Sequence, residues 1–267
     1  TRKESSAASD VYKRQVVEGD VTSTQLVNPG ERINNRVQES RKAVRISNVQ
    51  EKTNSAGKLY TMASQMAKKS AELKLDMEYA LLNNKTAVVG SDSIAPELRG
   101  LEGWVATNNS LGDGGVAPDP INNTAATDGT ERPFTEDLLK DVIQKIWVQG
   151  GKPNLILAGP SQKQKFGTFA GRAGTSINDA ASAKTLVNAV DIYVSDFGRL
   201  KVVPSRVQRA RTVFIVETEK CSVDYLIPFT KKDLAYQGGS EAKEISVAYT
   251  LKVGNEKALG AIRDLTV

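Results

Sequence analysis

The sequence predicts an α+β fold, with helices concentrated in the first half of the chain and strands in the second. Three observations support this prediction. A helical apolar period runs through residues 55–84, an amphipathic helix follows near 135–150, and apolar alternation recurs from about residue 189 onward. Helices and strands do not alternate regularly, so a doubly wound βαβ sheet is disfavoured.

The composition excludes several kinds of site. The chain has 267 residues, a formal net charge of +5, no histidine and one cysteine, Cys221. Without histidine there can be no Ser-His-Asp or Cys-His catalytic group and none of the usual zinc or non-haem iron sites. One cysteine allows no internal disulfide. We find no signal-peptide pattern and no apolar run of membrane-spanning length, and we expect no membrane association.

The front of the chain contains the polar stretch SSAASDVYKRQ at residues 5–15, which has no clear period. Reverse-translated, it resembles in frame the adapter used in transposase-based preparation of DNA libraries. We therefore expect residues 1–15 to be adapter-derived, in a chain translated from a metagenomic gene fragment. The alternative is a basic arm without fixed structure.

Residues 17–49 combine short alternations, such as 41–47, with a turn signal at Asn28-Pro29-Gly30. Their apolar content is low, so a polar two-stranded excursion of this kind cannot build its own core. It is either a surface hairpin or an arm that lies on a neighbouring subunit. We expect few long-range apolar contacts from it within one chain.

Residues 55–84 predict one helix of about 30 residues, roughly 45 Å long. Asn54 or Ser55 would cap its start, and Asn83-Asn84 would end it. A single helix of this length suggests a central spine helix against which other elements pack. Its apolar stripe comprises Leu59, Met62, Ala63, Met66, Ala67, Leu73, Met77, Ala80 and Leu81.

A long surface loop is predicted at 107–133 because Gly, Asn, Asp, Thr and Pro dominate there. Thr135 is a good N-cap for the next helix, and Gly150 is a good C-terminal stop. The buried face of that helix would be Leu138, Leu139, Val142, Ile143, Ile146 and Trp147.

The second half of the chain predicts mainly strands. A continuous apolar run at 153–159 indicates a buried strand, and Pro160 suits the first turn of a short helix. A glycine-rich loop follows at 171–185. Further strands are predicted at 189–198, 198–206, 212–219 and 220–229, and a long alternating span at 244–267 turns near Gly254-Asn255.

Motifs that could carry catalysis are weak. Ser55 and Lys58 match S-x-x-K, but the S-D-N and K-T-G elements of penicillin-binding enzymes are absent and the serine suits a helix cap. Glu217 and Glu219 would share one face of a strand, which favours a solvated face over a catalytic pair. Cys221 is interpreted as a small core residue. We therefore predict no enzyme, cofactor or metal site.

A basic turn, PSRVQRART, contains Arg206, Arg209 and Arg211. It either contacts phosphate or pairs with carboxylates at a subunit contact. Aromatic residues do not alternate with these arginines, which favours the second interpretation.

The order of several segments resembles that of a known family. They are VEGD at 17–20, AKKSAELKLDMEYALL at 67–82, VDIYVSDFGRLKVVPSR at 190–206, VFIVETEKCSVDYLIPF at 213–229 and TLKVGNEKALGAIRDLT at 250–266. Together they resemble the major head (capsid) proteins of tailed double-stranded DNA phages, which have the Hong Kong 97-type capsid fold. The resemblance runs from about Val17 to Val267.

The resemblance implies a domain order. Residues 16–52 would be a partial E-loop arm, 53–106 the spine helix and following segment of the P-domain, 107–230 mainly the A-domain, and 231–267 strands that return to the P-domain. The N-terminal arm and first E-loop strand of the family are missing in front of VEGD. Inter-subunit contacts would involve Glu18, Gly19, Asp20, Arg41 and Arg45 on the arm, and the three arginines of the basic turn.

The function that the resemblance implies is mechanical. Copies of the chain would form pentamers and hexamers, which close into an icosahedral head around phage DNA held by non-specific contacts. Scaffold, portal and decoration proteins are further possible partners, and assembly would occur in the cytoplasm of the bacterial host. The alternatives are an encapsulin-like nanocompartment shell, which gene neighbours would distinguish, and an unrelated enzyme that uses carboxylates with Ser or Lys.

Overall fold

The computed structural model of this protein describes residues 33–53, 61–169 and 192–267. Its helices are α2 (Asn48–Lys52), α3 (Met62–Asn83), α4 (Leu101–Trp104), α5 (Glu136–Val148) and α6 (Pro160–Phe166), with 3₁₀ turns η1 (Thr218–Lys220) and η2 (Glu256–Ala258). Its strands are β1 (Gln38–Ser47), β2 (Asn109–Ser110), β3 (Leu155–Ala158), β4 (Ile192–Ser195), β5 (Gly198–Pro204), β6 (Val213–Val216), β7 (Cys221–Asp233), β8 (Ser240–Val253) and β9 (Gly260–Ile262).

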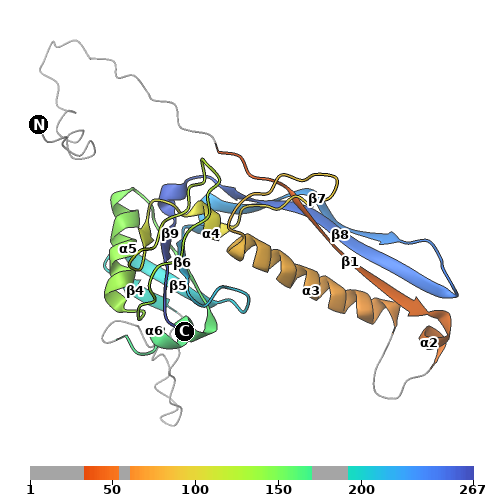
Figure 1. The fold of residues 1–267 in the computed structure, drawn as a ribbon. Helices are drawn as coiled ribbons and strands as arrows, with labels where there is room; N and C mark the ends of the chain where they lie inside the picture. The colour runs from red at the N-terminus through yellow and green to blue at the C-terminus, as the bar shows by residue number, and fades with distance from the viewer. Residues whose placement is uncertain (1–32, 54–60, 170–191) are drawn as a thin grey trace, which may run out of the picture. The chain divides into compact units, whose positions relative to one another are not determined.

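The strands form two sheets within Asn34–Val267, which is one unit by its internal contacts. One sheet has three strands in the order β1-β8-β7, and the other has six in the order β2-β9-β6-β3-β5-β4. Helix α3 runs along the three-stranded sheet, and α5 lies beside the six-stranded one (Figure 1). All described α-helices end by Phe166, and six of the nine described strands follow them, so helices and strands do not alternate regularly and the α+β class is confirmed.

Strand β1 belongs to the three-stranded sheet along its whole length. It pairs antiparallel with β8, from Gln38 opposite Tyr249 to Ser47 opposite Ser240. The predicted arm was expected to make few long-range apolar contacts, and for 38–47 this was wrong, because Val44 and Ile46 are buried in the core. Strand β1 has few apolar residues, but its backbone N–H and C=O groups pair with those of β8. This pairing holds β1 in the sheet. The earlier part of the predicted arm, residues 16–32, lies outside the described residues.

The spine helix is shorter than predicted. Helix α3 has 22 residues, about 33 Å, and begins after Thr61, whose Oγ1 accepts a hydrogen bond from the Ser64 amide at 3.4 Å. The predicted caps Asn54 and Ser55 lie outside the described residues. The buried side chains are Met62, Met66, Leu73, Met77, Ala80 and Leu82, whereas Ala63 and Ala67 are exposed and Leu81 is half-buried. The C-terminal part of α3 contacts α4 as well as the sheet, so the buried side changes along the helix.

The main core lies between the six-stranded sheet and its helices. Ile156 of β3 is opposite Val202 of β5 and Ile215 of β6, so these three side chains share one face of the sheet. They pack in one buried cluster with the apolar face of α5 and with Phe166 of α6. The buried side chains of α5 are Leu139, Val142, Ile143 and Ile146, as predicted.

The ends of α5 agree only partly with the sequence. Thr135 occupies the N-cap position but makes no side-chain capping bond, and Gly150 follows the helix with φ +88°, a conformation that glycine adopts without strain. Trp147, predicted to be buried, is 44% exposed because it contacts Phe197 at the surface, with ring centroids 5.4 Å apart. Leu138 is only partly buried against the core.

The chain end is shared between the two sheets. The long alternation appears as β8, η2 and β9, with the turn at Gly254-Asn255 as predicted. However, β8 pairs with β1 and β7, while β9 lies between β2 and β6 in the other sheet. The predicted domain boundary at 230/231 also falls inside β7, because Thr230 and Lys231 both pair with β8. The domain assignments themselves stay predictions.

Candidate functional site

A line of charged side chains, most of it buried, lies between α4 and the last strand. It comprises Arg263, Glu102, Arg209 and Asp128. The Arg263 guanidinium donates from Nη1 to Glu102 Oε1 at 2.6 Å, and the two side chains are 4% and 2% exposed. Arg209 Nη1 lies 3.4 Å from the same oxygen, and Arg209 also pairs with Asp128 nearer the surface. The sequence analysis did not single out Glu102 or Arg263. The sequence feature that could have indicated this pair is the position of Glu102 between apolar residues and glycine in LEGW.

The charges of this line shift one another's pKa values. Burial lowers the pKa of Arg263, and the Glu102 charge opposes that shift. The hydrogen bond with Asp128 raises the pKa of Arg209, and the same bond lowers the pKa of the Asp128 carboxyl. The charged groups of this network are paired with one another within the chain, so the network is structural.

The Arg209–Asp128 pair makes stability depend on pH in a defined direction. A carboxyl whose pKa is lowered by folding stabilises the native state above its unfolded pKa, about 3.9, and loses this effect as the pH falls through the folded value. Asp128→Asn should cost about 1 kcal/mol or less at neutral pH, since the side chain is 37% exposed. Urea unfolding at falling pH should show the difference from wild type shrinking below about pH 4. A constant difference would contradict this assignment.

Two residues of the predicted basic turn have carboxylate partners in their own chain. Arg209 pairs as described, and Arg211 Nη2 lies 3.4 Å from Glu131 Oε1. These intramolecular contacts fit the preference for carboxylates over phosphate, because the loop before α5 brings its acidic residues to Arg209 and Arg211. The inter-subunit role of these two arginines stays a prediction. Arg206 is exposed, and its role stays a prediction.

The predicted arm residues are only partly described. Glu18, Gly19 and Asp20 lie outside the described residues. Arg41 and Arg45 share the face of β1 that points away from α3, since Lys42 on the opposite face reaches Asp76 of that helix at 2.7 Å. On that outer face Arg41 Nε lies 3.3 Å from Glu39 Oε1, and Arg45 donates to Gln237 at 3.0 Å. Their role in subunit contacts stays a prediction.

Glu217 and Glu219 were expected to share one solvated face of a strand, and they do not. Strand β6 ends at Val216, and Glu219 lies in η1. Glu217 is buried rather than solvated, and its Oε2 accepts a hydrogen bond from the Lys152 amide at 2.8 Å. The prediction was wrong because this carboxylate satisfies a backbone N–H. Ser55 and Lys58 of the S-x-x-K match lie outside the described residues.

Cys221, predicted to be a small core residue, is half-buried at the start of β7. Burial, assisted by the Glu217 charge, raises the pKa of its thiol to about 11. Because the thiolate is the nucleophile, alkylation by iodoacetamide at pH 8 should be about a hundredfold slower in the native chain than in urea-unfolded chain. Mass spectrometry over time measures this at the only cysteine; similar rates would contradict the assignment.

The loop predicted at 107–133 is held by the chain end. Asp264 has φ +59°, and its two carboxylate oxygens each accept a backbone N–H at 2.9 Å, one from Gly112 and one from Gly129. Bridges Val116–Thr127 and Asp119–Thr124 order the loop further. The loop is therefore a fixed surface structure.

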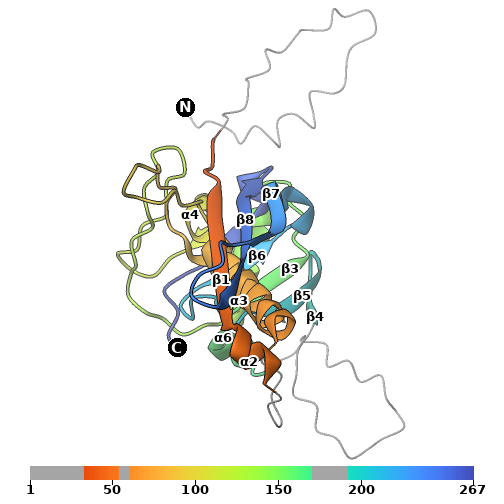
Figure 2. The same ribbon diagram turned by 90° about the vertical axis from the view of Figure 1, so that its right-hand side faces the viewer.

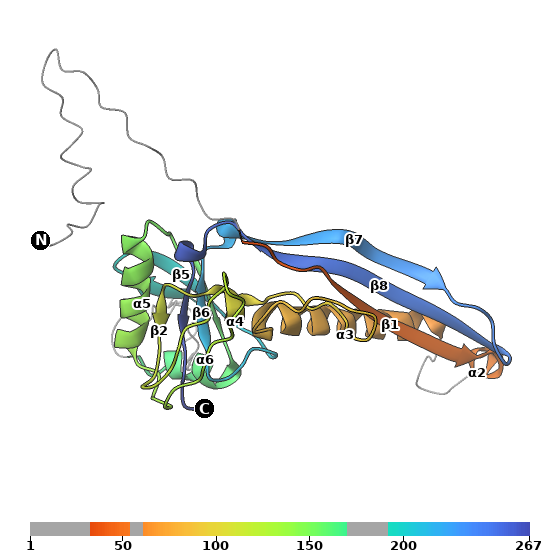
Figure 3. The same cartoon turned by 45° about the horizontal axis from the view of Figure 1, so that its top comes forward.

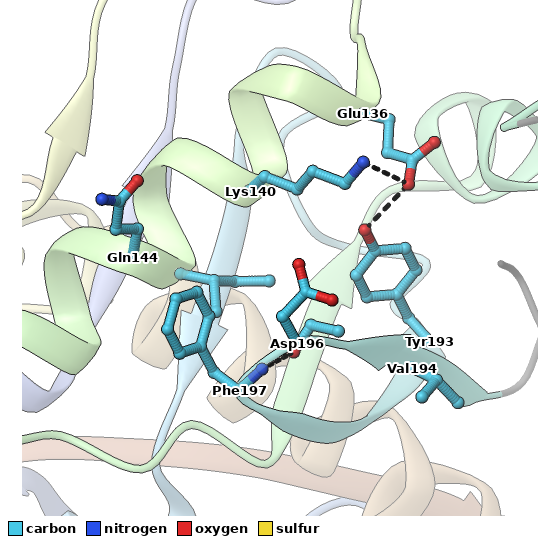
Figure 4. A pocket seen from close by; sticks show the side chains of 9 residues that line it. Glu136, Lys140, Gln144, Tyr193, Val194, Asp196 and Phe197 are labelled. Atoms are coloured by element: carbon cyan, nitrogen blue, oxygen red, sulfur yellow. Dashed lines mark hydrogen bonds and ion pairs between the residues drawn. The ribbon is translucent and has the colours of Figure 1, made fainter.

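A hollow of about 600 Å³ lies between α5 and the β4–β5 hairpin (Figure 4). Glu136 Oε1 is 3.1 Å from Lys140 Nζ and accepts a hydrogen bond from the Tyr193 hydroxyl at 3.1 Å. These groups are therefore engaged with one another, and we see no nucleophile with an adjacent base. Within the described ranges there is no cluster of three or more potential metal ligands and no helix long and apolar enough to cross a bilayer.

An exposed apolar run lies on β7, at an edge of the three-stranded sheet. Tyr225, Leu226, Ile227 and Phe229 are 40–71% exposed. The sequence predicted a strand here but gave no sign of which sheet it joins. An apolar run on an open edge is typical of a contact surface between chains.

The long helix α3 runs along a three-stranded sheet that carries an exposed apolar edge, and a mixed six-stranded sheet follows. The comparisons with known proteins identify this arrangement. The sequence matches the family described as SU10 major capsid protein over residues 2–266. The chain belongs to this family, and it is a structural capsid protein. The match includes residues 5–15, whose interpretation as adapter sequence stays a prediction. Among curated proteins, none matches the sequence.

Solved structures support the fold. A chain of the holo-SrpI encapsulin complex from Synechococcus elongatus PCC 7942 is 15% identical, with a TM-score of 0.55 over 86% of this chain and 74% of that one. A chain of the satellite phage P4 procapsid, which includes the size determination protein, is 11% identical, with 0.54 over 95% and 79%. A chain from Mycobacterium phage Adephagia is 11% identical, with 0.55 over 95% and 81%.

Proposed function

We propose that copies of this chain form pentamers and hexamers, which close into an icosahedral phage head around DNA. The observation that carries this proposal is the family match over nearly the whole chain. The fold supports it physically, because a long helix and long strands spread contacts over several neighbours and many modest interfaces then reinforce one another. The role is mechanical rather than catalytic, and the chain uses no cofactor.

The finer assignments are part of the same proposal. Helix α3 and the three-stranded sheet correspond to the P-domain, most of the six-stranded sheet to the A-domain, and the residues before β1 to the E-loop arm. Arg41 and Arg45 point outward from β1 beside that arm and are available to a neighbouring subunit. Scaffold, portal and decoration proteins would complete the head in the bacterial cytoplasm, and packaged DNA would be held without sequence specificity.

A nanocompartment shell is the second candidate, because an encapsulin chain is among the structures that share this fold. The two candidates differ in cargo. Particles purified from the native host should contain nuclease-protected DNA if they are phage heads, and an enzyme if they are nanocompartments. Portal, protease and terminase genes beside this one would also favour the head.

Electron microscopy of two versions of the protein tests the proposal. A gene extended upstream to a genuine methionine, with its scaffold supplied, should give regular closed particles. The 267-residue chain should be mostly monomeric or form rings of capsomer size, because on the adapter interpretation residues 1–15 are not capsid sequence and make no subunit contacts. Light scattering compares the two versions in solution. A monomeric extended protein would contradict the shell function, and closed shells from the 267-residue chain would show that replacing residues 1–15 is not needed for assembly.

A further inference from the structure

Two exposed surfaces of opposite character flank the three-stranded sheet. The first, the β7 edge, comprises Tyr225, Leu226, Ile227, Phe229, Lys231 and Lys232. The second, the loop face, comprises Val89, Ile94, Val116 and Ile121 with Asp92, Glu97, Asp113 and Asp119. We propose that the β7 edge of one copy docks against the loop face of the next copy, a head-to-tail contact that rests on the proposed shell function.

The loop face is one structure built from two loops. Asn123 joins them, since its side chain accepts a hydrogen bond from the Ala87 amide at 2.9 Å and donates to the Ala87 carbonyl at 2.7 Å. Arg99 also donates to Asn123 at 2.8 Å. The four apolar side chains of the loop face are 54–64% exposed. Exposed apolar side chains on loops that are held in place are typical of contact surfaces.

The charge of the loop face is one-sided. Residues 84–132 contain seven acidic and three basic residues: Arg99 is 3% exposed, Arg132 is half-buried and donates to Ser110, and Lys85 is exposed. Three of the acids, Glu102, Asp128 and Glu131, already face arginines of this chain. The other four are the acids of the loop face, so it presents negative charge around apolar side chains.

The β7 edge has the complementary charge. Its two lysines follow the apolar run directly, and both are exposed. The carboxylates near the two ends of the strand, Asp224 and Asp233, lie 3.7 Å from Lys252 and 3.3 Å from Lys243. Lys232 lies opposite Glu244 of β8, whereas Lys231 lies opposite the apolar Ile245, so Lys231 is the positive charge beside the apolar run that has no carboxylate opposite it in the ladder. When the basic apolar edge meets the acidic apolar face, opposite charges attract and apolar side chains are buried. Both effects favour association.

The contact would be made through side chains rather than by adding a strand. The pairing of β7 with β8 shifts between Tyr225 and Ile227 and again between Ile227 and Thr230. These irregularities bend the edge, and Pro228 has no N–H to donate. A neighbouring strand could not extend the ladder there, whereas the exposed side chains remain available for packing.

The two surfaces lie on opposite sides of one sheet, which suits a ring. Strand β7 is one edge and β1 the other. The loop face is tied to the β1 side, because Gln38 accepts a hydrogen bond from the Leu98 amide at 3.2 Å and Asn35 accepts one from Arg99 at 2.7 Å. Figures 2 and 3 show the loops around α4 on the β1 side, with β7 beyond β8. Two different surfaces on opposite sides generate head-to-tail contacts, which close into rings.

Zero-length cross-linking tests this contact even if association is weak. An equal mixture of isotope-labelled and unlabelled chain is treated with a carbodiimide, which joins lysine to a touching carboxylate, and inter-chain peptides are mapped by mass spectrometry. We expect links from Lys231 or Lys232 to Asp92, Glu97, Asp113 or Asp119. Absence of inter-chain links, or links confined to other surfaces, would overturn the proposal.

Charge exchange gives a stronger test. Lys231→Glu/Lys232→Glu alone should lose the links, and Asp92→Lys/Asp113→Lys alone should lose those to positions 92 and 113 and weaken those to Glu97 and Asp119. Mixing the two variants should give two kinds of link: wild-type links from the lysines of the second variant to the acids of the first, and reversed links between the exchanged positions. Lys68→Glu/Lys74→Glu on α3 is the matched control and should keep the wild-type links. Failure of the mixture to link would overturn the proposal.

The apolar part of the contact is tested separately. Leu226→Asp should reduce the link yield about tenfold or more, while Val49→Asp, at a residue that is 77% exposed on α2, should not. Equal yields from both variants would overturn the proposal. Closed particles formed without these links would reject the contact and leave the shell function standing. If the links form but the extended gene gives no particles, the contact stands and the shell function is rejected.

Discussion

Replacing Leu73 with aspartate should destabilise the protein by about 4 kcal/mol or more. The Leu73 side chain is fully buried, in the middle of α3. Removing its apolar contacts alone costs about 2–5 kcal/mol, and an unpaired carboxylate in the same place adds the cost of burying a charge. Urea unfolding followed by circular dichroism measures the loss, and a variant that fails to fold would agree with it.

The matched control lies on the same helix. Leu75 is 44% exposed. Leu75→Asp is the same substitution and has the same helix-propensity cost, but it does not bury a charge. It should cost less than about 1 kcal/mol. Equal effects at both positions would mean that the face of α3 against the sheet is assigned wrongly.

Removing the charge of Glu102 should cost about 3–5 kcal/mol. Glu102→Gln keeps the shape of the side chain but leaves the Arg263 guanidinium buried without its carboxylate. Arg209 would also lose one of its two acidic partners. The melting temperature and urea midpoint should both fall, and replacing Arg263 with methionine as well should recover part of the loss, because no unpaired charge then remains.

An exposed ion pair of the same kind provides the control. Lys145 and Asp141 lie 2.7 Å apart on the surface of α5, with about half of each side chain exposed. Asp141→Asn should cost about 0.5 kcal/mol or less, since solvent screens the pair. If Glu102→Gln cost no more than this, the buried network would have no special role.

The buried network also bears on assembly. It lies under the segment that carries the loop face, and Asp264 holds the same segment through Gly112 and Gly129. The acidic side chains of the loop face therefore lie on a backbone that is already held in place. Less conformational entropy is then lost on association. Partial destabilisation by Glu102→Gln should accordingly weaken the contact with the β7 edge.

The sequence predicted the elements whose signal is local. The apolar face of α5, the buried strand at β3 and the start of α6 at Pro160 each follow from spacing or from one residue with a strong backbone preference. The order of segments along the chain also sufficed to recognise the capsid family. These features depend on neighbours in the sequence, so they can be read without the fold.

The sequence alone determined the α+β class, the capsid family and the existence of a long helix. Only the tertiary structure decided that β1 pairs with β8, that Glu217 is buried against a backbone amide, and that Arg209 faces Asp128 of its own chain. It also decided which apolar strand stays at an open edge. These outcomes depend on contacts between residues tens to about two hundred positions apart, and a long-range contact leaves no period in either of the segments that it joins.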